Sequence, residues 1–100
     1  MSDHHITALV TLSTDVPQPK NGGVRSGYAP HHKFDGVEYL VSGFHSYVDS
    51  EIHYPGETVM AEITFPSWAF FGGQIKPGDI FEIREMSRLV GSGIVQSVDA

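Results

Sequence analysis

The C-terminal segment FEIREMSRLVGSGIVQSV, residues 81–98, constrains the fold of this chain more than any other segment. Apolar residues alternate with polar ones on both sides of a short turn at residues 85–88. A two-residue period places successive side chains on opposite faces of a β-strand, and two such runs joined by a short turn form a β-hairpin. The segment therefore predicts a C-terminal antiparallel hairpin.

Three further segments have the character of strands. Residues 6–12 and 58–65 place apolar side chains at every second position, and residues 37–48 are rich in β-forming residues with apolar side chains on both faces. No segment shows a sustained helical period, and no internal repeat is visible. Short strands at this spacing predict an all-β domain, specifically a closed six-stranded antiparallel barrel, because closure removes unpaired sheet edges.

Glycine and proline mark the connections between these strands. Pro-Gly pairs at 55–56 and 77–78 predict tight turns, and residues 13–27, with two prolines and three glycines, predict an exposed loop. Gly91 and Gly93 lie two residues apart on one face of the last predicted strand. This spacing indicates a sharp bend or the close approach of a neighbouring backbone.

Length and composition limit the class of protein. One hundred residues predict a single domain with a core large enough to fold alone. The absence of cysteine excludes disulfides and thiolate metal ligands. No apolar run approaches the ~18 residues of a membrane-spanning helix, and the first residues lack the features of a signal peptide. We therefore expect a cytoplasmic protein without a membrane segment.

The charge balance argues against a nucleic-acid binder. Twelve acidic and six basic residues give a net charge of −6, and the basic residues are scattered along the chain. Proteins that bind nucleic acids usually neutralise phosphates with clustered lysine and arginine. Contact with RNA through one small patch is compatible with this balance but is disfavoured by it.

Four segments carry a resemblance to a known family. They are GYAPHHKF at residues 27–34, PGE at 55–57, ITFP at 63–66, and the C-terminal hairpin with its Ile-Arg-Glu run, Arg88, Gly91 and Gly93. In this order, over about residues 6–98, they resemble the C-terminal β-barrel of elongation factor Tu and related translation GTPases. The resemblance implies a stand-alone, six-stranded antiparallel barrel that occupies residues 1–100.

The resemblance also suggests partners. In that family the barrel packs on the GTPase domain, contacts the T-stem backbone of aminoacyl-tRNA and helps to receive the exchange factor. Here the segment NGGVRSG lacks the Gly-Lys-Ser/Thr ending of a phosphate loop, so no nucleotide binding is expected. Glu85 and Arg88 keep the family's residue types, whereas the turn between them does not. The candidate RNA contacts are Tyr28, His31, Lys33, Glu85 and Arg88.

The segment FPSWAFFGG, about where the family has a shorter loop, is the most informative apolar stretch. Trp68, Phe70 and Phe71 either plug one end of the barrel or form a protein contact, since aromatic side chains anchor interfaces. We predict protein–protein association through this loop, with another protein or a second copy of the chain as the partner.

Six histidines raise the alternative of a metal or small-ligand protein. Two adjacent pairs, at residues 4–5 and 31–32, would place their side chains on opposite faces of a strand. His45 and His53 fall on or near separate strands, with Asp49 or Glu51 close by in sequence. A zinc site needs three or four converging ligands, and no such spacing is present. We therefore expect hydrogen-bonded or solvated histidines, and neither a metal nor another cofactor.

No catalytic motif stands out. No serine lies in a G-x-S-x-G motif, which forms a nucleophile elbow, and the spacing of the carboxylates does not indicate an acid–base pair. The sequence therefore predicts a non-catalytic module that binds protein. The alternatives are a tRNA-binding module and a histidine-based metal or ligand protein.

Overall fold

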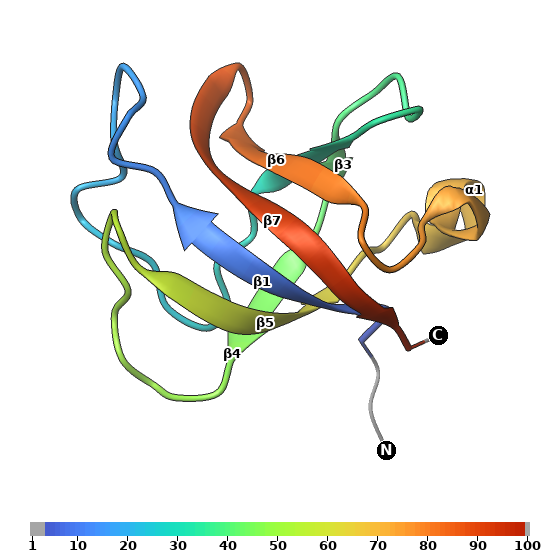
Figure 1. Cartoon of the computed structure of the whole chain (residues 1–100), viewed down its shortest axis with the longest axis horizontal. Helices are drawn as coiled ribbons and strands as arrows, with labels where there is room; N and C mark the ends of the chain where they lie inside the picture. Colours follow the sequence, from blue (N-terminus) through green and yellow to red (C-terminus); the bar gives the residue numbers. More distant parts are fainter. Residues whose placement is uncertain (1–3, 100) are drawn as a thin grey trace.

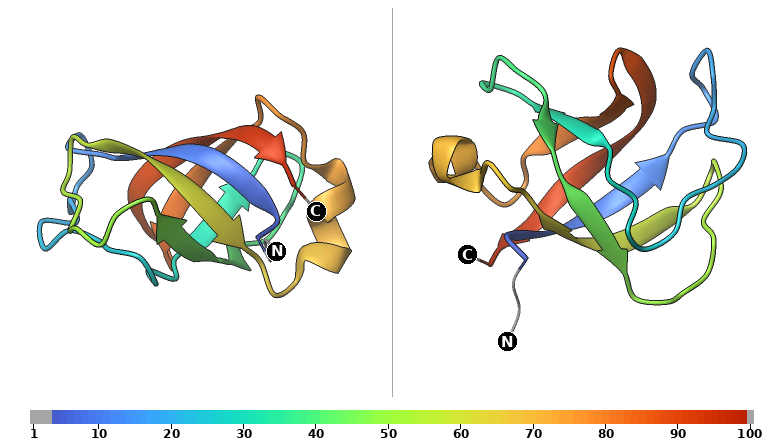
Figure 2. Two further views of the ribbon diagram at one scale, coloured as in Figure 1. Left: turned by 90° about the horizontal axis from the view of Figure 1, so that it is seen from below. Right: turned by 180° about the vertical axis from the view of Figure 1, so that it is seen from behind.

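The computed structural model of this protein describes residues 4–99, which fold into a mostly β structure. The strands form one curled antiparallel sheet with the order β3-β2-β6-β7-β1-β5-β4 (Figures 1 and 2). One short helix and one 3-10 turn cover an end of the sheet. The elements are β1 (Ile6–Leu12), β2 (His31–Phe34), β3 (Val41–Ser42), β4 (Phe44–Tyr47), β5 (Thr58–Thr64), α1 (Trp68–Phe71), η1 (Gly72–Gln74), β6 (Ile80–Glu85) and β7 (Arg88–Val98).

The all-β prediction is confirmed, and so are the strongest strand predictions. Strand β1 matches the alternating segment at residues 6–12, and β5 matches the segment at residues 58–65. Strands β6 and β7 form the hairpin predicted at residues 81–98. Both predicted Pro-Gly turns are present, with Gly56 and Gly78 at φ of 96° and 94°. A left-handed φ at the third position of a turn favours glycine, because a side chain there would be strained.

Residues 37–48 form two short strands rather than one long strand. Strand β3 pairs with β2, whereas β4 pairs with β5, which lies toward the opposite edge of the sheet. Only Gly43 separates the two strands. A Cβ atom at Gly43 would lie 2.8 Å from both the His32 and Phe65 rings, so only glycine fits between them. The chain therefore changes strand partner at the one residue without a side chain.

The core lies inside the curl of the sheet. Alternate residues of β1, such as Ile6 and Val10, are completely buried, as the two-residue period predicts. Burying one such aliphatic side chain contributes about 1.5–3 kcal/mol. At the α1 end the core is aromatic, and Phe34, Phe65 and Phe71 pack with ring centroids 5.3–5.8 Å apart.

Two glycines in β7 allow close packing, as the sequence indicated. A Cβ atom at Gly91 would lie 2.3 Å from the carbonyl oxygen of Thr11, and one at Gly93 would lie 2.2 Å from the Phe81 ring. The ladder between β6 and β7 also shifts register at Ile83/Arg84, directly opposite Gly91. Strand β7 therefore bends where its backbone meets β1.

We predict that Gly91→Ala lowers the free energy of unfolding by about 1–3 kcal/mol, the usual cost of overpacking a rigid site. The atom in the way is backbone, which cannot rotate aside. Urea unfolding measures the change. Gly73→Ala is the matched control, since a Cβ atom there meets nothing within 4 Å. Equal stabilities of the two variants would contradict the packing argument.

Candidate functional site

Two histidines form the polar centre of the core. The Nε2 atoms of His32 on β2 and His45 on β4 are 2.8 Å apart, and both side chains are almost completely buried. The Nδ1 atom of His32 lies 3.1 Å from the carbonyl oxygen of Val41, and that of His45 lies 2.9 Å from the Tyr47 hydroxyl. Every nitrogen of the pair therefore has a hydrogen-bond partner.

The partners fix the position of each proton. The Val41 carbonyl can only accept, so the Nδ1 atom of His32 donates to it. In a neutral ring the Nε2 atom of His32 must then accept a hydrogen bond from the Nε2–H group of His45. This leaves the Nδ1 atom of His45 to accept from the Tyr47 hydroxyl. The network is satisfied with both rings neutral.

Burial keeps the network neutral. It lowers the pKa of His32 to about 4, although the hydrogen bond to Val41 acts in the opposite direction. Burial, reinforced by the nearby His32, also holds the pKa of His45 well below its usual value. Burial raises the pKa of the Tyr47 hydroxyl, so this group remains protonated. The pair is therefore a structural hydrogen-bond network without a charge.

We predict that stability falls as pH is lowered from about 6.5 toward 4. The unfolded histidines gain protons near the usual pKa of about 6.5, whereas folded His32 and His45 resist them. The unfolded state then binds more protons, so its population rises. Urea unfolding at several pH values gives the slope, and NMR titration of the rings identifies the groups. A flat profile over this range would contradict the prediction.

The histidine pair does not have the geometry of a metal site. A tetrahedral Zn²⁺ ion with Zn–N bonds of about 2.0 Å would hold two nitrogens roughly 3.3 Å apart, whereas the two Nε2 atoms are at hydrogen-bond distance. Across residues 4–99, no group of three or more histidine, aspartate or glutamate side chains could hold a metal ion. Sequence reasoning did not find this pair, because only the pairing of distant strands brings the two rings together.

The structure gathers four of the five candidate RNA contacts near the β6–β7 turn. The Tyr28 hydroxyl donates to the Glu85 carboxylate at 2.7 Å, and the backbone N–H of Met86 donates to the Nδ1 atom of His31 at 3.1 Å. Lys33 lies farther along β2, where its ammonium donates to the carbonyl oxygen of Phe34. The polar groups that would meet RNA therefore already have partners within the chain.

Arg88 and Glu85 each contact three groups of the chain. The Arg88 guanidinium donates to Glu85 and to the carbonyl oxygens of Gln18 and Pro19, at 3.0–3.2 Å. Lys20 forms a further ion pair with Glu85. These contacts of Arg88 and Lys20 hold the 13–27 loop against the β6–β7 hairpin. Because both cations already bind groups of the chain, they are poorly placed to bind an RNA phosphate.

The aromatic loop is divided between the core and the surface. Phe71 is 1% exposed, and Trp68 is partly buried, with its ring stacked on His5 at 4.9 Å. A Cβ atom at Gly72 would overlap the Trp68 ring, so this glycine allows the loop to fold back. Phe70 alone of the three aromatic residues points outward, with 80% of its surface exposed.

We predict that truncation of Phe71 destabilises the fold strongly and that truncation of Phe70 does not. Phe71→Ala should cost about 3–5 kcal/mol of unfolding free energy, as expected for a core aromatic residue. Phe70→Ala, the matched control on the same turn, should change it by less than about 0.5 kcal/mol. Urea unfolding distinguishes them. Comparable losses in the two variants would show that the α1 end packs differently.

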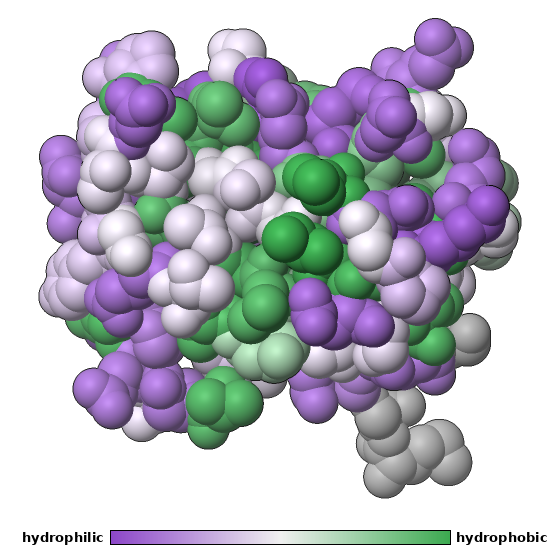
Figure 3. Space-filling view, viewed as in Figure 1, coloured by the Kyte–Doolittle hydropathy of each residue, from purple (hydrophilic) through white to green (hydrophobic). Residues whose placement is uncertain are grey.

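An apolar row crosses the outer face of the sheet. Ile80 pairs with Ile94, Ile94 with Leu9, and Leu9 with Met60, so four neighbouring strands contribute one side chain each. Ile80 is 62% and Ile94 43% exposed. Figure 3 shows a band of apolar side chains across the face formed by β6, β7, β1 and β5. We refer to Ile80, Ile94, Leu9 and Met60 as the apolar row.

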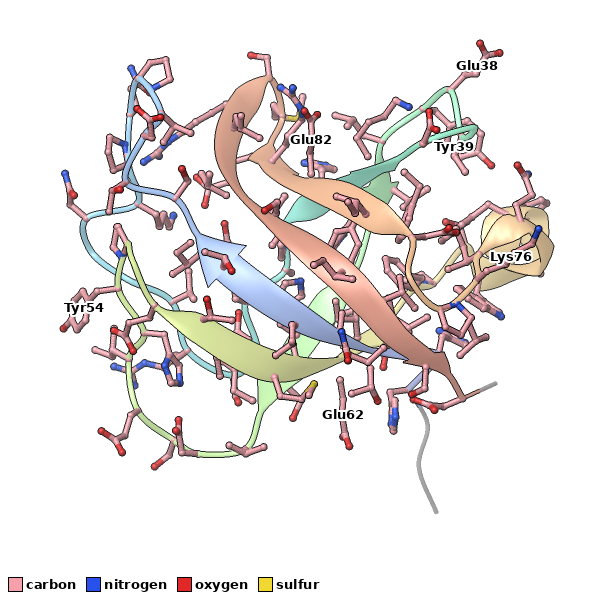
Figure 4. All side chains as sticks on the ribbon, in the orientation of Figure 1. Glu38, Tyr39, Tyr54, Glu62, Lys76 and Glu82 are labelled. Atoms are coloured by element: carbon pink, nitrogen blue, oxygen red, sulfur yellow. The ribbon has the colours of Figure 1, made fainter. Side chains whose placement is uncertain are left out.

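Polar residues border the apolar row on both sides. On one side are Ser92 and the Thr11–Thr58 hydroxyl pair, which are hydrogen-bonded at 2.8 Å. Glu82 and Glu62 lie on opposite sides of the row (Figure 4). The sequence carried a signal for this row, because each of its members occupies an outward position of a strand. The register that aligns them could not be read from the sequence.

A groove lies beside this face, between the 35–40 loop and the β6–β7 turn. It has a volume of about 560 Å³ and is lined by Tyr39, Leu40 and Met86 above Lys33 and Arg84. Glu38 and Tyr39, which both line the groove, lie on the 35–40 loop (Figure 4). The Arg84 guanidinium is bound to Glu82 at 2.8 Å, so the groove has no free pair of cations for an anionic ligand.

Comparisons with known proteins add no identification. No protein-family model matches the chain, and no curated protein matches it. Within residues 4–99, no helix is long and apolar enough to cross a membrane.

Proposed function

We propose that this chain is a non-catalytic module that binds another protein through the outer face of β6, β7, β1 and β5. The single observation that carries the proposal is the apolar row. Contiguous apolar surface with a polar border is characteristic of protein interfaces. The row has both features, because serine, threonine and glutamate side chains occupy the flanking positions.

We further infer that the sheet closes into a six-stranded barrel, with β3, Gly43 and β4 acting as one bent strand. Two backbone hydrogen bonds of 2.8 Å link His45 to Gly27 and Tyr28, and the Gly43 N–H donates to Pro30 at 3.1 Å. These bonds extend the β2–β3 ladder toward β4, which itself pairs with β5. They support closure, and with it the resemblance to the C-terminal barrel of elongation factor Tu.

The charge of this face favours a basic partner. The outward residues of β1, β5 and β7 next to the row are serine, threonine, glutamine and Glu62, without lysine or arginine among them. On β6, Glu82 and Arg84 form an ion pair, so Glu62 is the remaining acidic charge on this part of the face. The chain as a whole carries a net charge of −6. Complementary charge speeds association and suppresses wrong partners. A second copy of the same acidic chain fits this condition less well than a basic protein surface does.

The predicted aromatic-loop contact remains part of the proposal through Phe70. The tRNA alternative is less favoured, because Arg88 and Lys20 bind groups of their own chain. The histidine-based ligand alternative is also less favoured, because each nitrogen of the His32–His45 pair already has a hydrogen-bond partner.

Photo-crosslinking tests this proposal. A benzoylphenylalanine at position 94, in the centre of the row, should crosslink a defined basic protein in extracts of the source cells. The same group at exposed Lys76, away from the row, is the control. Met60→Ser and Ile80→Ser together should weaken binding of the purified partner roughly tenfold or more, because truncation of central interface side chains costs at least about 1–2 kcal/mol. Equal crosslinking from positions 94 and 76 would refute the proposal.

A further inference from the structure

His53 lies between two carboxylates. Its Nε2 atom is 2.9 Å from Oδ1 of Asp49, and its Nδ1 atom is 3.1 Å from Oε1 of Glu57. An ionised carboxylate can only accept hydrogen bonds, so both ring nitrogens must donate. The ring can do so only as the imidazolium cation. His53 is 8% exposed, whereas the two carboxylates lie at the surface.

His53 also joins two loops through its backbone. His53 and Val24 exchange backbone N–H···O hydrogen bonds of 2.7 and 2.8 Å, which join the 48–57 loop to the 13–30 segment. The second oxygen of Glu57 accepts the backbone N–H of Tyr54 at 2.6 Å. Figure 1 shows both loops on the same side of the sheet. The ring thus stands where the two loops meet.

The groups that face this ring are few. From the 48–57 loop they are the carboxylates of Asp49 and Glu57, and from β4 it is the edge of the Tyr47 ring, with centroids 5.4 Å apart. The Tyr47 hydroxyl is bound to His45. The 13–30 segment meets His53 through the backbone of Gly23 and Val24. The two carboxylates therefore dominate the electrostatics around the ring.

We propose that Asp49, His53 and Glu57 form a proton-dependent latch. While His53 is charged, its two ion pairs fix the 48–57 loop in the shape that lets the His53 backbone pair with Val24 of the 13–30 segment, and this pairing loosens when His53 loses a proton. In the neutral ring one nitrogen has no proton and faces a carboxylate at hydrogen-bond distance. That contact changes from a charge-assisted hydrogen bond into a repulsion between two acceptors. The inference does not depend on protein binding by the apolar row.

The direction of the response follows from the contacts. Burial acts to lower the pKa of His53, but the hydrogen bonds that the ring donates to Asp49 and Glu57, with the charges of these carboxylates, outweigh it and raise the pKa above 6.5. The same bonds help to lower the pKa of both carboxyls. A raised folded pKa means that the stabilisation is complete below about 6.5 and is lost as pH rises through the folded value. This is the opposite direction to the His32–His45 pair.

Hydrogen exchange tests the latch directly. After correction for the intrinsic exchange rate at each pH, protection of the Val24 and His53 amides should fall about tenfold or more between roughly pH 6 and pH 9, as expected for the loss of one charge-assisted hydrogen bond. The amides of β1 should not follow this transition. Constant protection of Val24 and His53 over this range would overturn the proposal.

Two variants make the test specific. Asp49→Asn removes one of the carboxylates that raise the pKa, so the transition should move to lower pH. Glu51→Gln is the matched control on the same loop, and it should leave the transition where it is. His53→Gln should abolish it, and a transition that persists in this variant would overturn the proposal. If His53→Gln fails to fold, nitrogen NMR of His53 in the unmodified protein tests the proposal instead. Both ring nitrogens should carry a proton at about pH 6, and one unprotonated nitrogen would overturn the proposal.

Discussion

The hydrogen bond between His32 and His45 is the contact on which the arrangement of the sheet depends. It joins β2, the partner of β3, to β4, which begins just after the chain changes strand partner at Gly43. Two imidazoles can occupy this core only because each nitrogen is satisfied without a charge. Gly43 provides the space for the His32 ring. A mostly apolar core thus contains one fully satisfied polar contact.

Strand positions could be predicted from the sequence where one face of a strand is buried and the other is not. Strands β1, β5, β6 and β7 all meet this condition, and their alternation was readable. Residues 37–48 do not meet this condition. Their side chains are partly buried and partly exposed, and the strand is interrupted at Gly43, where the chain changes its strand partner. The short helix α1 was also missed, since a single turn is too brief to show a helical period.

The candidate sites were less accessible to sequence reasoning, for a different physical reason. Each depends on which residues of separate strands stand opposite one another. Leu9 and Ile94 are far apart in the chain and become neighbours only through the β1–β7 register. The same holds for His32 and His45. The aromatic loop was recognised, but its division into buried Phe71 and exposed Phe70 depends on how one turn of helix is oriented.

The direction of the buried hydrogen bonds has one more consequence. The series runs from the Tyr47 hydroxyl through His45 and His32, and it ends on the Val41 carbonyl oxygen. A carbonyl group accepts a hydrogen bond but has no proton to donate to a further group, so the series cannot conduct protons beyond Val41. Its fixed polarity instead makes it a permanent dipole inside the sheet, one that can be reversed only by breaking its terminal bond.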